Sequence, residues 1–310
     1  MSMQVEKEKR SEHSIGFING FIAYIIWGAV ILYWPYLAPA KPLEILAHRI
    51  LWSLLFVAAI LIYQKRIVSL RVVARNARQM KLLGAASVFI AINWGLFIWA
   101  SMNSHALDAS LGYYITPLLN VALGVFFFKE KLRSMQWIAI GIAAFAVFFI
   151  TIAMGVLPWI ALTLALSFTF YGYVKKLANV QALESLMIET LLLAPVAIGY
   201  LFWLQFNGGN TFLEYGLDHT LWMASAGIVT AIPLLAFGVA ITRLPFTTLG
   251  MLQYIGPTIQ FFVGVWLTQE EMPQVRLIGF IITWVALVIL TVDALRNRRN
   301  VSKSLVTNPD

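Results

Sequence analysis

Two stretches of the chain place polar residues along one face of an otherwise apolar helix. The first stripe comprises Tyr113, Pro117, Asn120 and Gly124, and the second, 140 positions later, comprises Gln253, Pro257, Gln260 and Gly264. Spacings of four, three and four residues bring such positions onto one side of a helix. Amides that face hydrocarbon lose hydrogen bonds at a cost of several kcal/mol, so both stripes should face protein or water. They either join helices to each other or line a solute pathway, and we favour the pathway.

The two prolines occupy matching places in these stripes. Pro117 and Pro257 each remove one backbone hydrogen bond from an apolar stretch. A membrane tolerates such a break where a neighbouring helix or a cavity satisfies the freed carbonyl. The pattern fits either a structural kink or a gating point. The pairing of the two prolines at matching positions favours the gating interpretation as much as the kink.

Aromatic and amide side chains also gather near the middle of other apolar stretches. They are Tyr24 and Trp27 in the first stretch, Asn93 and Trp94 in the third, and Tyr114 and Tyr254 beside the two stripes. Flat rings with a few amides suit an amphipathic organic solute better than a small ion. We therefore expect a small organic solute as the ligand of this face.

Three ionisable residues stand within apolar stretches and form a candidate charge site. His48 and Arg49 are adjacent, and Glu189 lies 140 positions after Arg49. Ionisable groups inside a membrane are expensive and often functional. Ion pairing or snorkelling that fixes helix ends explains the same residues, so proton coupling stays open.

Composition requires that these residues be held by membrane-spanning elements. Hydrophobic residues make up 60% of the 310 residues and charged residues only 12%, which excludes an ordinary soluble domain. Continuous apolar stretches of roughly 20 residues predict an all-α integral membrane protein with about ten transmembrane helices. The expected spans are 15–37, 43–63, 82–101, 107–128, 134–153, 156–173, 184–206, 220–241, 247–268 and 274–294.

Basic residues alternate along the chain in a way that predicts topology. They cluster before the first span, between the second and third, and after the fourth, sixth, eighth and tenth, whereas the other connections hold only Lys41 and Arg276. The positive-inside rule therefore places both termini in the cytoplasm. The basic residues fix topology and do not indicate nucleic acid, and the expected partners besides a solute are membrane lipids.

The chain aligns with itself at an offset of 140 positions. Leu43-Glu44 matches Leu183-Glu184, Tyr114-Ile115 matches Tyr254-Ile255, and Glu130 matches Glu270. This register predicts two five-helix repeats, 15–153 and 154–294, flanked by a tail at 1–14 and a basic tail at 295–310. An odd number of helices inverts the second repeat, and inverted repeats are the basis of alternating access in many secondary transporters.

Several chemistries find no support in the sequence. The chain has no cysteine, no nucleotide-binding loop and no metalloprotease or hydrolase motif, so we expect neither an enzyme nor a cofactor nor a metal site. The competing interpretation is a non-transporting sensor or assembly partner whose polar faces only join helices. Neither the solute, the direction of movement nor the oligomeric state follows from the residues.

Four motifs together resemble the RarD-type permeases of the drug/metabolite transporter superfamily, in its EamA-type branch. They are LEILAHRILWS at 43–53, NWGLFIWASMNSHALDASLGYYITPL at 93–118, SFTFYGYVKK at 167–176 and RLPFTTLGMLQYIGPT at 243–258. The resemblance implies a bacterial cytoplasmic (inner) membrane permease whose central cavity is lined by helices 1, 3, 4, 6, 8 and 9. It further implies export or exchange of amino acids, metabolites or drugs.

Overall fold

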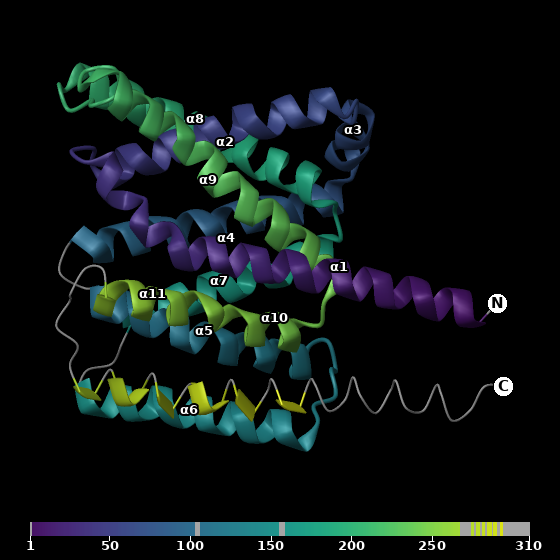
Figure 1. Cartoon of the computed structure of the whole chain (residues 1–310). Helices are drawn as coiled ribbons and strands as arrows, with labels where there is room; N and C mark the ends of the chain where they lie inside the picture. The colour runs from purple at the N-terminus through teal and green to yellow at the C-terminus, as the bar shows by residue number, and fades with distance from the viewer. Residues whose placement is uncertain are drawn as a thin grey trace.

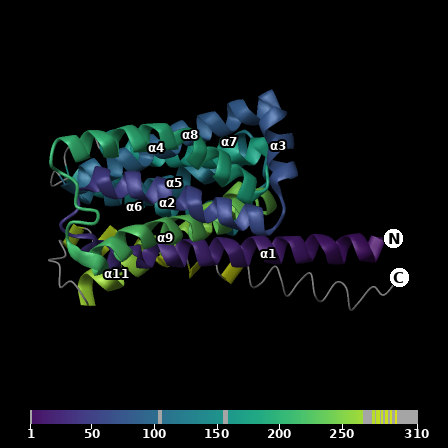
Figure 2. The same cartoon turned by 90° about the horizontal axis from the view of Figure 1, so that it is seen from above.

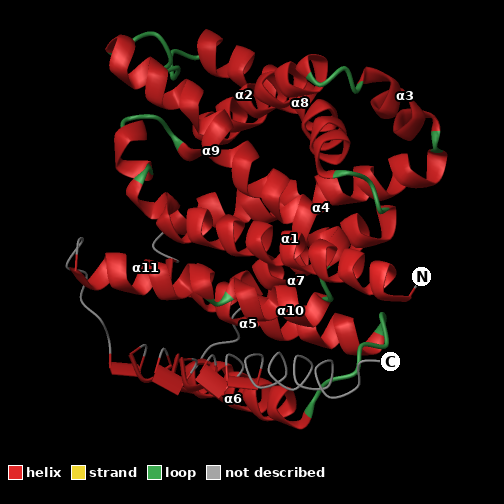
Figure 3. Ribbon diagram, turned by 45° about the vertical axis from the view of Figure 1, so that its right-hand side comes forward, coloured by secondary structure: helices red, strands yellow, loops and turns green. Residues whose placement is uncertain are grey.

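Every described element of regular structure is helical (Figure 3). The computed structural model describes residues 2–102, 106–154 and 159–266, together with 274–275, 277–279, 281–282, 284–286, 288–289 and 292–293. The residues described between 274 and 293 are helical, as expected of the tenth span, and the expected basic tail at 295–310 lies outside the described residues.

The expected spans of the first half correspond to helices of the structure. These are α1 (Ser2–Ala29), followed by the 3-10 turns η1 (Val30–Leu32) and η2 (Trp34–Leu37), then α2 (Pro42–Tyr63), α4 (Ala77–Met102), α5 (Ala106–Phe126) and α6 (Ser134–Met154). A short helix, α3 (Ile67–Arg75), lies in the connection that the sequence marked only by its basic residues. The helix α3 carries apolar side chains on one face and basic side chains on the other, which suits a helix that lies at a membrane surface.

The second half begins with α7 (Trp159–Ala178), α8 (Ala182–Phe206) and α9 (Gly216–Arg243). The span expected at 247–268 is instead two helices, α10 (Phe246–Gln253) and α11 (Ile255–Trp266). Pro257 has no N–H to donate to the carbonyl of Gln253, the last residue of α10, which accounts for a break at this point. Pro117, by contrast, sits inside an uninterrupted α5, so the two prolines do not have the same local effect.

The outer surface of the bundle is apolar, as hydrocarbon requires. Five described helices are long and apolar enough to cross a membrane, namely Pro42–Tyr63, Ala77–Phe97, Ser134–Ala153, Ala182–Phe206 and Gly216–Arg243. Leu55, Phe145, Phe148, Val196 and Phe202 are each more than half exposed on this surface. Large exposed apolar faces of this kind fit contact with lipid rather than with water.

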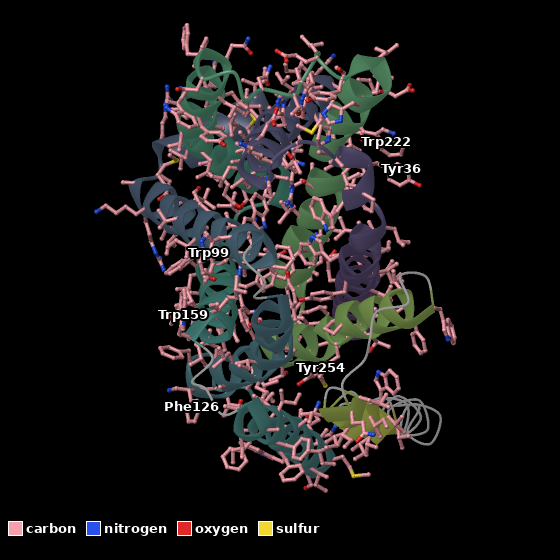
Figure 4. The ribbon with its side chains drawn as sticks, turned by 90° about the vertical axis from the view of Figure 1, so that its left-hand side faces the viewer. Tyr36, Trp99, Phe126, Trp159, Trp222 and Tyr254 are labelled. Atoms are coloured by element: carbon pink, nitrogen blue, oxygen red, sulfur yellow. The ribbon has the colours of Figure 1, made fainter. Side chains whose placement is uncertain are left out.

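Aromatic side chains mark one end of the bundle. Tyr36 stacks on Trp222 with ring centres 4.6 Å apart, and Trp99 lies 6.1 Å from Trp159. Figure 4 looks from this end and shows the two pairs on opposite sides of the bundle. Exposed Trp and Tyr are typical of the boundary between hydrocarbon and head groups.

Several connections that carry basic residues lie at the opposite end of the bundle. The start of α1, helix α3 and the connections α7–α8 and α9–α10 all lie at the right-hand end in Figure 1, and Figure 2 shows α1 and α3 at the same end. There Arg243 pairs with Glu12 at 2.7 Å, and Arg66 pairs with Glu184 at 2.7 Å. These described basic segments therefore share one end of the molecule.

Candidate functional site

A small cavity surrounds the guanidinium of Arg49 near the aromatic end. It is lined by α1, η1, η2, α2 and α9 and holds about 30 Å³ that the centre of a water molecule can reach, which is room for roughly two waters. Its wall also includes Trp27, Val30, Tyr33, Trp34, Ala226, Val229 and Thr230. It is thus a largely apolar pocket with aromatic walls, into which one charged group is set.

Three contacts hold Arg49 in this cavity. Its Nε donates to Oγ1 of Thr230 at 2.8 Å. Its guanidinium carbon lies 5.2 Å from the ring centre of Trp34 and 4.8 Å from that of Trp94. Cation–π contacts at these distances are favourable, and they hold the planar group between two flat rings.

The pocket exists because α2 and α9 cross at very short range. A Cβ added to Gly227 would lie 2.3 Å from the backbone carbon of Trp52, and Ser53 Oγ donates to the Gly227 carbonyl at 2.9 Å. Small residues permit such close approach of membrane helices. This crossing places Thr230, one turn along α9, against Arg49.

An aromatic cluster continues from the cavity toward the other end of α1. Tyr24 and Phe237 lie 5.5 and 5.6 Å from Trp27, and Phe168 lies 5.7 Å from it. The Tyr24 hydroxyl is buried and has no hydrogen-bond partner among the described residues. The predicted pair Tyr24 and Trp27 therefore lies on one continuous aromatic path that begins at Arg49.

The predicted amides Asn120 and Gln253 contact each other. Asn120 Nδ2 on α5 donates to Gln253 Oε1 on α10 at 2.8 Å, and the two residues are 4% and 5% exposed. In the conformation observed, the two polar stripes meet as a buried helix-to-helix hydrogen bond. Gly250 is pressed against the same helix, since a Cβ there would lie 3.2 Å from Asn120 Cβ.

Other predicted residues are placed apart from the cavity. Asn93 Nδ2 donates to the Leu164 carbonyl at 2.9 Å and to Ser167 Oγ at 3.1 Å, which ties α4 to α7. Tyr113 packs edge-on against Phe97 at 5.7 Å. Tyr254, labelled in Figure 4, is 4% exposed, and its hydroxyl has no hydrogen-bond partner among the described residues.

The members of the predicted charge site are separated, and each has its own surroundings. Glu189 accepts from Lys175 Nζ at 2.7 Å, from Tyr171 Oη at 2.9 Å and from Ser185 Oγ at 2.6 Å. The His48 ring stacks on Phe212 at 4.5 Å, and its Nε2 has no hydrogen-bond partner among the described residues. Arg49 and Glu189 therefore do not pair with each other.

The residue types and spacings did not point to several neighbours of the candidate residues. These neighbours are Thr230, Tyr33 and Lys175. Only Lys175 offered a signal, as a charge inside the motif SFTFYGYVKK. The side chains of Tyr114 and Gln260, both predicted for the pathway, lie outside the described part of the structure.

Comparison with known proteins places this architecture in a family. The model of the EamA-like transporter family matches residues 14–152. Protein RarD of Streptomyces exfoliatus is 47% identical over 297 residues, covering 96% of this chain and 93% of the relative. Protein RarD of Escherichia coli is 40% identical over 290 residues, covering 93% of this chain and 97% of the relative.

A solved crystal structure shares the fold at lower identity. It superposes with a TM-score of 0.69, is 16% identical, and the alignment covers 89% of this chain and 97% of that one. The likeness supports the helical arrangement described above. The sequence identity to the RarD proteins extends over nearly the whole chain. This chain therefore belongs to the EamA-like transporter family, as a RarD-type permease of the drug/metabolite transporter superfamily.

Proposed function

We propose that this chain is a secondary transporter of small organic solutes that works by alternating access in the bacterial cytoplasmic membrane. Residues 15–153 and 154–294 form two inverted repeats of five spans each, and the tails at 1–14 and 295–310 lie in the cytoplasm. The observation that carries this proposal is an exchange relation between the two halves, which appears in the helix contacts.

The 140-position offset relates α1 to α7, α2 to α8, α4 to α9, and α5 to α10 with α11. Pro42 and Ala182, the first residues of α2 and α8, are separated by that offset, and Ala77 and Gly216, which begin α4 and α9, are one residue short of it. The helix α1 packs on α9 as α7 packs on α4, and α2 packs on α9 as α8 packs on α4. Likewise α5 packs on α7 and α11 on α1, while α2 contacts α8 and α5 contacts α10. Exchanging the halves thus reproduces these contacts, as a pseudo-twofold axis would require.

Two buried carboxylates follow the same exchange. Glu44, in the first turn of α2, accepts a hydrogen bond at 2.6 Å from the backbone N–H of Thr211, which lies in the connection after α8. Glu184, in the first turn of α8, accepts a hydrogen bond at 2.7 Å from Nη2 of Arg66, which lies in the connection after α2. In each half, a glutamate at the equivalent position therefore accepts a hydrogen bond from the other half. A shared apolar composition alone does not explain this match.

The two halves also run in opposite directions. The helix α1 begins at the end where α3 lies, whereas its counterpart α7 finishes there (Figure 1). Gln79 Nε2, near the start of α4, donates to the Ala178 carbonyl at the end of α7 at 3.3 Å, in agreement with that direction. Opposed directions in related halves give two equivalent packings, one open to each side of a membrane.

The polar contacts of the candidate site cross between the halves. Arg49 with Thr230, Asn93 with Leu164, and Asn120 with Gln253 each join a residue of the first repeat to one of the second. A substrate in an inverted-repeat transporter lies at this interface. We assign the pathway to Tyr24, Trp27, Asn93, Trp94, Tyr113, Tyr114, Asn120, Gln253, Tyr254 and Gln260.

The names of the relatives support a membrane transporter. An uncharacterized transporter of Pseudomonas aeruginosa is 39% identical over 284 residues, and a chloramphenicol-sensitive protein RarD of the same species is 28% identical over 269 residues. The region matched by the family model, residues 14–152, coincides with the first proposed repeat. These names support a membrane transporter and leave its solute open.

A disulfide between the halves tests alternating access directly. Asn120 Cβ lies 3.2 Å from the position of a Cβ on Gly250, close to the roughly 3.5–4.5 Å of a disulfide. The double variant Asn120→Cys with Gly250→Cys needs no cysteine removal, because the chain has none. In proteoliposomes, oxidation should lower uptake of labelled chloramphenicol, benzoate or phenylalanine by about tenfold or more, and reduction should restore it, because α5 and α10 can then separate.

Each single cysteine variant is the matched control, and its own rate, measured before and after the same oxidant, should not change on oxidation. Full transport by the cross-linked protein would show that α5 and α10 need not separate, against the proposed mechanism. No uptake of any of the three solutes by the reduced protein would favour a non-transporting membrane protein instead.

A further inference from the structure

Arg49 carries hydrogen-bond donors that find no acceptor in the described part of the chain. A guanidinium has five N–H donors, and among the described residues only Nε donates to an acceptor, Thr230 Oγ1. Among the described residues, no carboxylate lies within ion-pairing distance of Arg49, and no acceptor receives a hydrogen bond from its Nη atoms. The rings of Trp34 and Trp94 lie near the guanidinium but offer no conventional hydrogen-bond acceptor.

The equivalent position in the second half holds a charged residue whose hydrogen bonds and charge are both balanced by neighbours. Glu189, the counterpart of Arg49, is nearly fully buried and accepts hydrogen bonds from Lys175, Tyr171 and Ser185. A charge that is taken out of water needs such partners. Arg49 is half-buried, and among the described residues it has one hydrogen-bond partner and two aromatic neighbours but no opposite charge.

The size and the lining of the cavity limit the group that could face Arg49 there. The space beside Arg49 holds about 30 Å³, enough for roughly two waters or the two oxygens of a carboxylate. Arginine binds carboxylates through two parallel hydrogen bonds, for which its Nη donors are suited. Trp34 and Trp27 line the same cavity, and the aromatic cluster of Tyr24, Phe168 and Phe237 continues from it.

We propose that Arg49 is the binding site for the carboxylate of an organic anion whose flat apolar body lies along this aromatic path. The inference rests on the proposed transport function and narrows its substrate class from organic solutes to aromatic or similarly flat carboxylates. Inorganic anions lack the apolar body that the rings would contact, and neutral organic solutes lack the charge that the free donors require.

Equilibrium binding tests the site without relying on transport. Labelled benzoate and labelled benzamide, which differ in the charge of one group, would be added to purified protein in phosphatidylcholine nanodiscs, so that no anionic lipid competes. Benzoate should bind about tenfold or more tightly than benzamide. Arg49→Gln should remove that preference, and Arg49→Lys should retain part of it, because lysine keeps the charge but not the two-pronged geometry.

Three controls make the result specific. Arg71→Gln removes an exposed arginine on α3 and should leave the benzoate preference unchanged. Inorganic phosphate should not displace benzoate at equal concentration. The thermal midpoint and elution profile of Arg49→Gln should match those of the parent protein, because no carboxylate partner among the described residues is left unpaired.

The outcomes separate this inference from the proposed function. Equal binding of benzoate and benzamide by the parent protein, an unchanged preference in Arg49→Gln, or displacement by phosphate would each overturn the anion site. The proposal that the protein transports neutral organic solutes would remain valid after such a result. Charge-selective binding that depends on Arg49, in a protein that moves no benzoate across proteoliposomes, would instead uphold the site and contradict the transport proposal.

Discussion

Replacing Glu189 with alanine is expected to lower the free energy of unfolding by about 3–5 kcal/mol. Lys175 Nζ lies 2.7 Å from Glu189 Oε1, and both side chains are only 3% exposed. Removing the carboxylate leaves a buried ammonium without its counter-charge and leaves Tyr171 and Ser185 without their acceptor. Titration with a denaturing detergent, followed by circular dichroism, measures the change.

The double variant Lys175→Met with Glu189→Leu is the informative control. It removes both charges at similar volume, so most of the lost stability should return. Glu12→Ala breaks an exposed ion pair with Arg243 and should cost less than about 1 kcal/mol. A double variant that is as unstable as Glu189→Ala would show that the network of Glu189 contributes by packing or hydrogen bonding rather than by charge balance.

Gly227→Ala is expected to destabilise the protein by about 3 kcal/mol or more, although alanine favours helices by up to about 1 kcal/mol. The added Cβ would lie 2.3 Å from the backbone carbon of Trp52 and 2.6 Å from the backbone N of Ser53. Backbone atoms inside a helix cannot rotate away, so α2 and α9 would have to move apart. The same movement would separate Arg49 from Thr230.

Gly199→Ala provides the matched comparison, because a Cβ at that position on α8 meets nothing within 4 Å. The same substitution there should leave stability unchanged or raise it slightly. Thermal midpoints measured in one detergent would compare the two variants. Equal midpoints would mean that the α2–α9 crossing can widen at little cost, and that close packing does not hold the cavity in shape.

The architecture was largely predictable because it depends on local properties of the chain. Apolar stretches long enough to cross a bilayer must become helices, since lipid offers no partner for free backbone groups. The helices α2, α4, α6, α8 and α9 accordingly coincide with expected spans to within a few residues. The 140-position register and the motifs that resemble RarD-type permeases were likewise present in the sequence alone.

The sequence also identified most residues of interest, because polar and charged side chains are rare in an apolar chain. It named Arg49, Glu189, Asn120 and Gln253 from their residue type and spacing alone. Spacing shows which residues share one face of a helix. It carries no information about which other helix that face meets.

Partners were therefore decided by the tertiary structure. Lys175 reaches Glu189 from the preceding helix, Asn120 donates to Gln253 across the two halves, and Arg49 donates to Thr230 between two tryptophan rings. These pairings depend on how closely helices approach and at what height they cross, as Gly227 shows for α2 and α9. Local hydropathy indicates that a segment spans the membrane, whereas the packing of distant helices determines which charged side chains pair with each other.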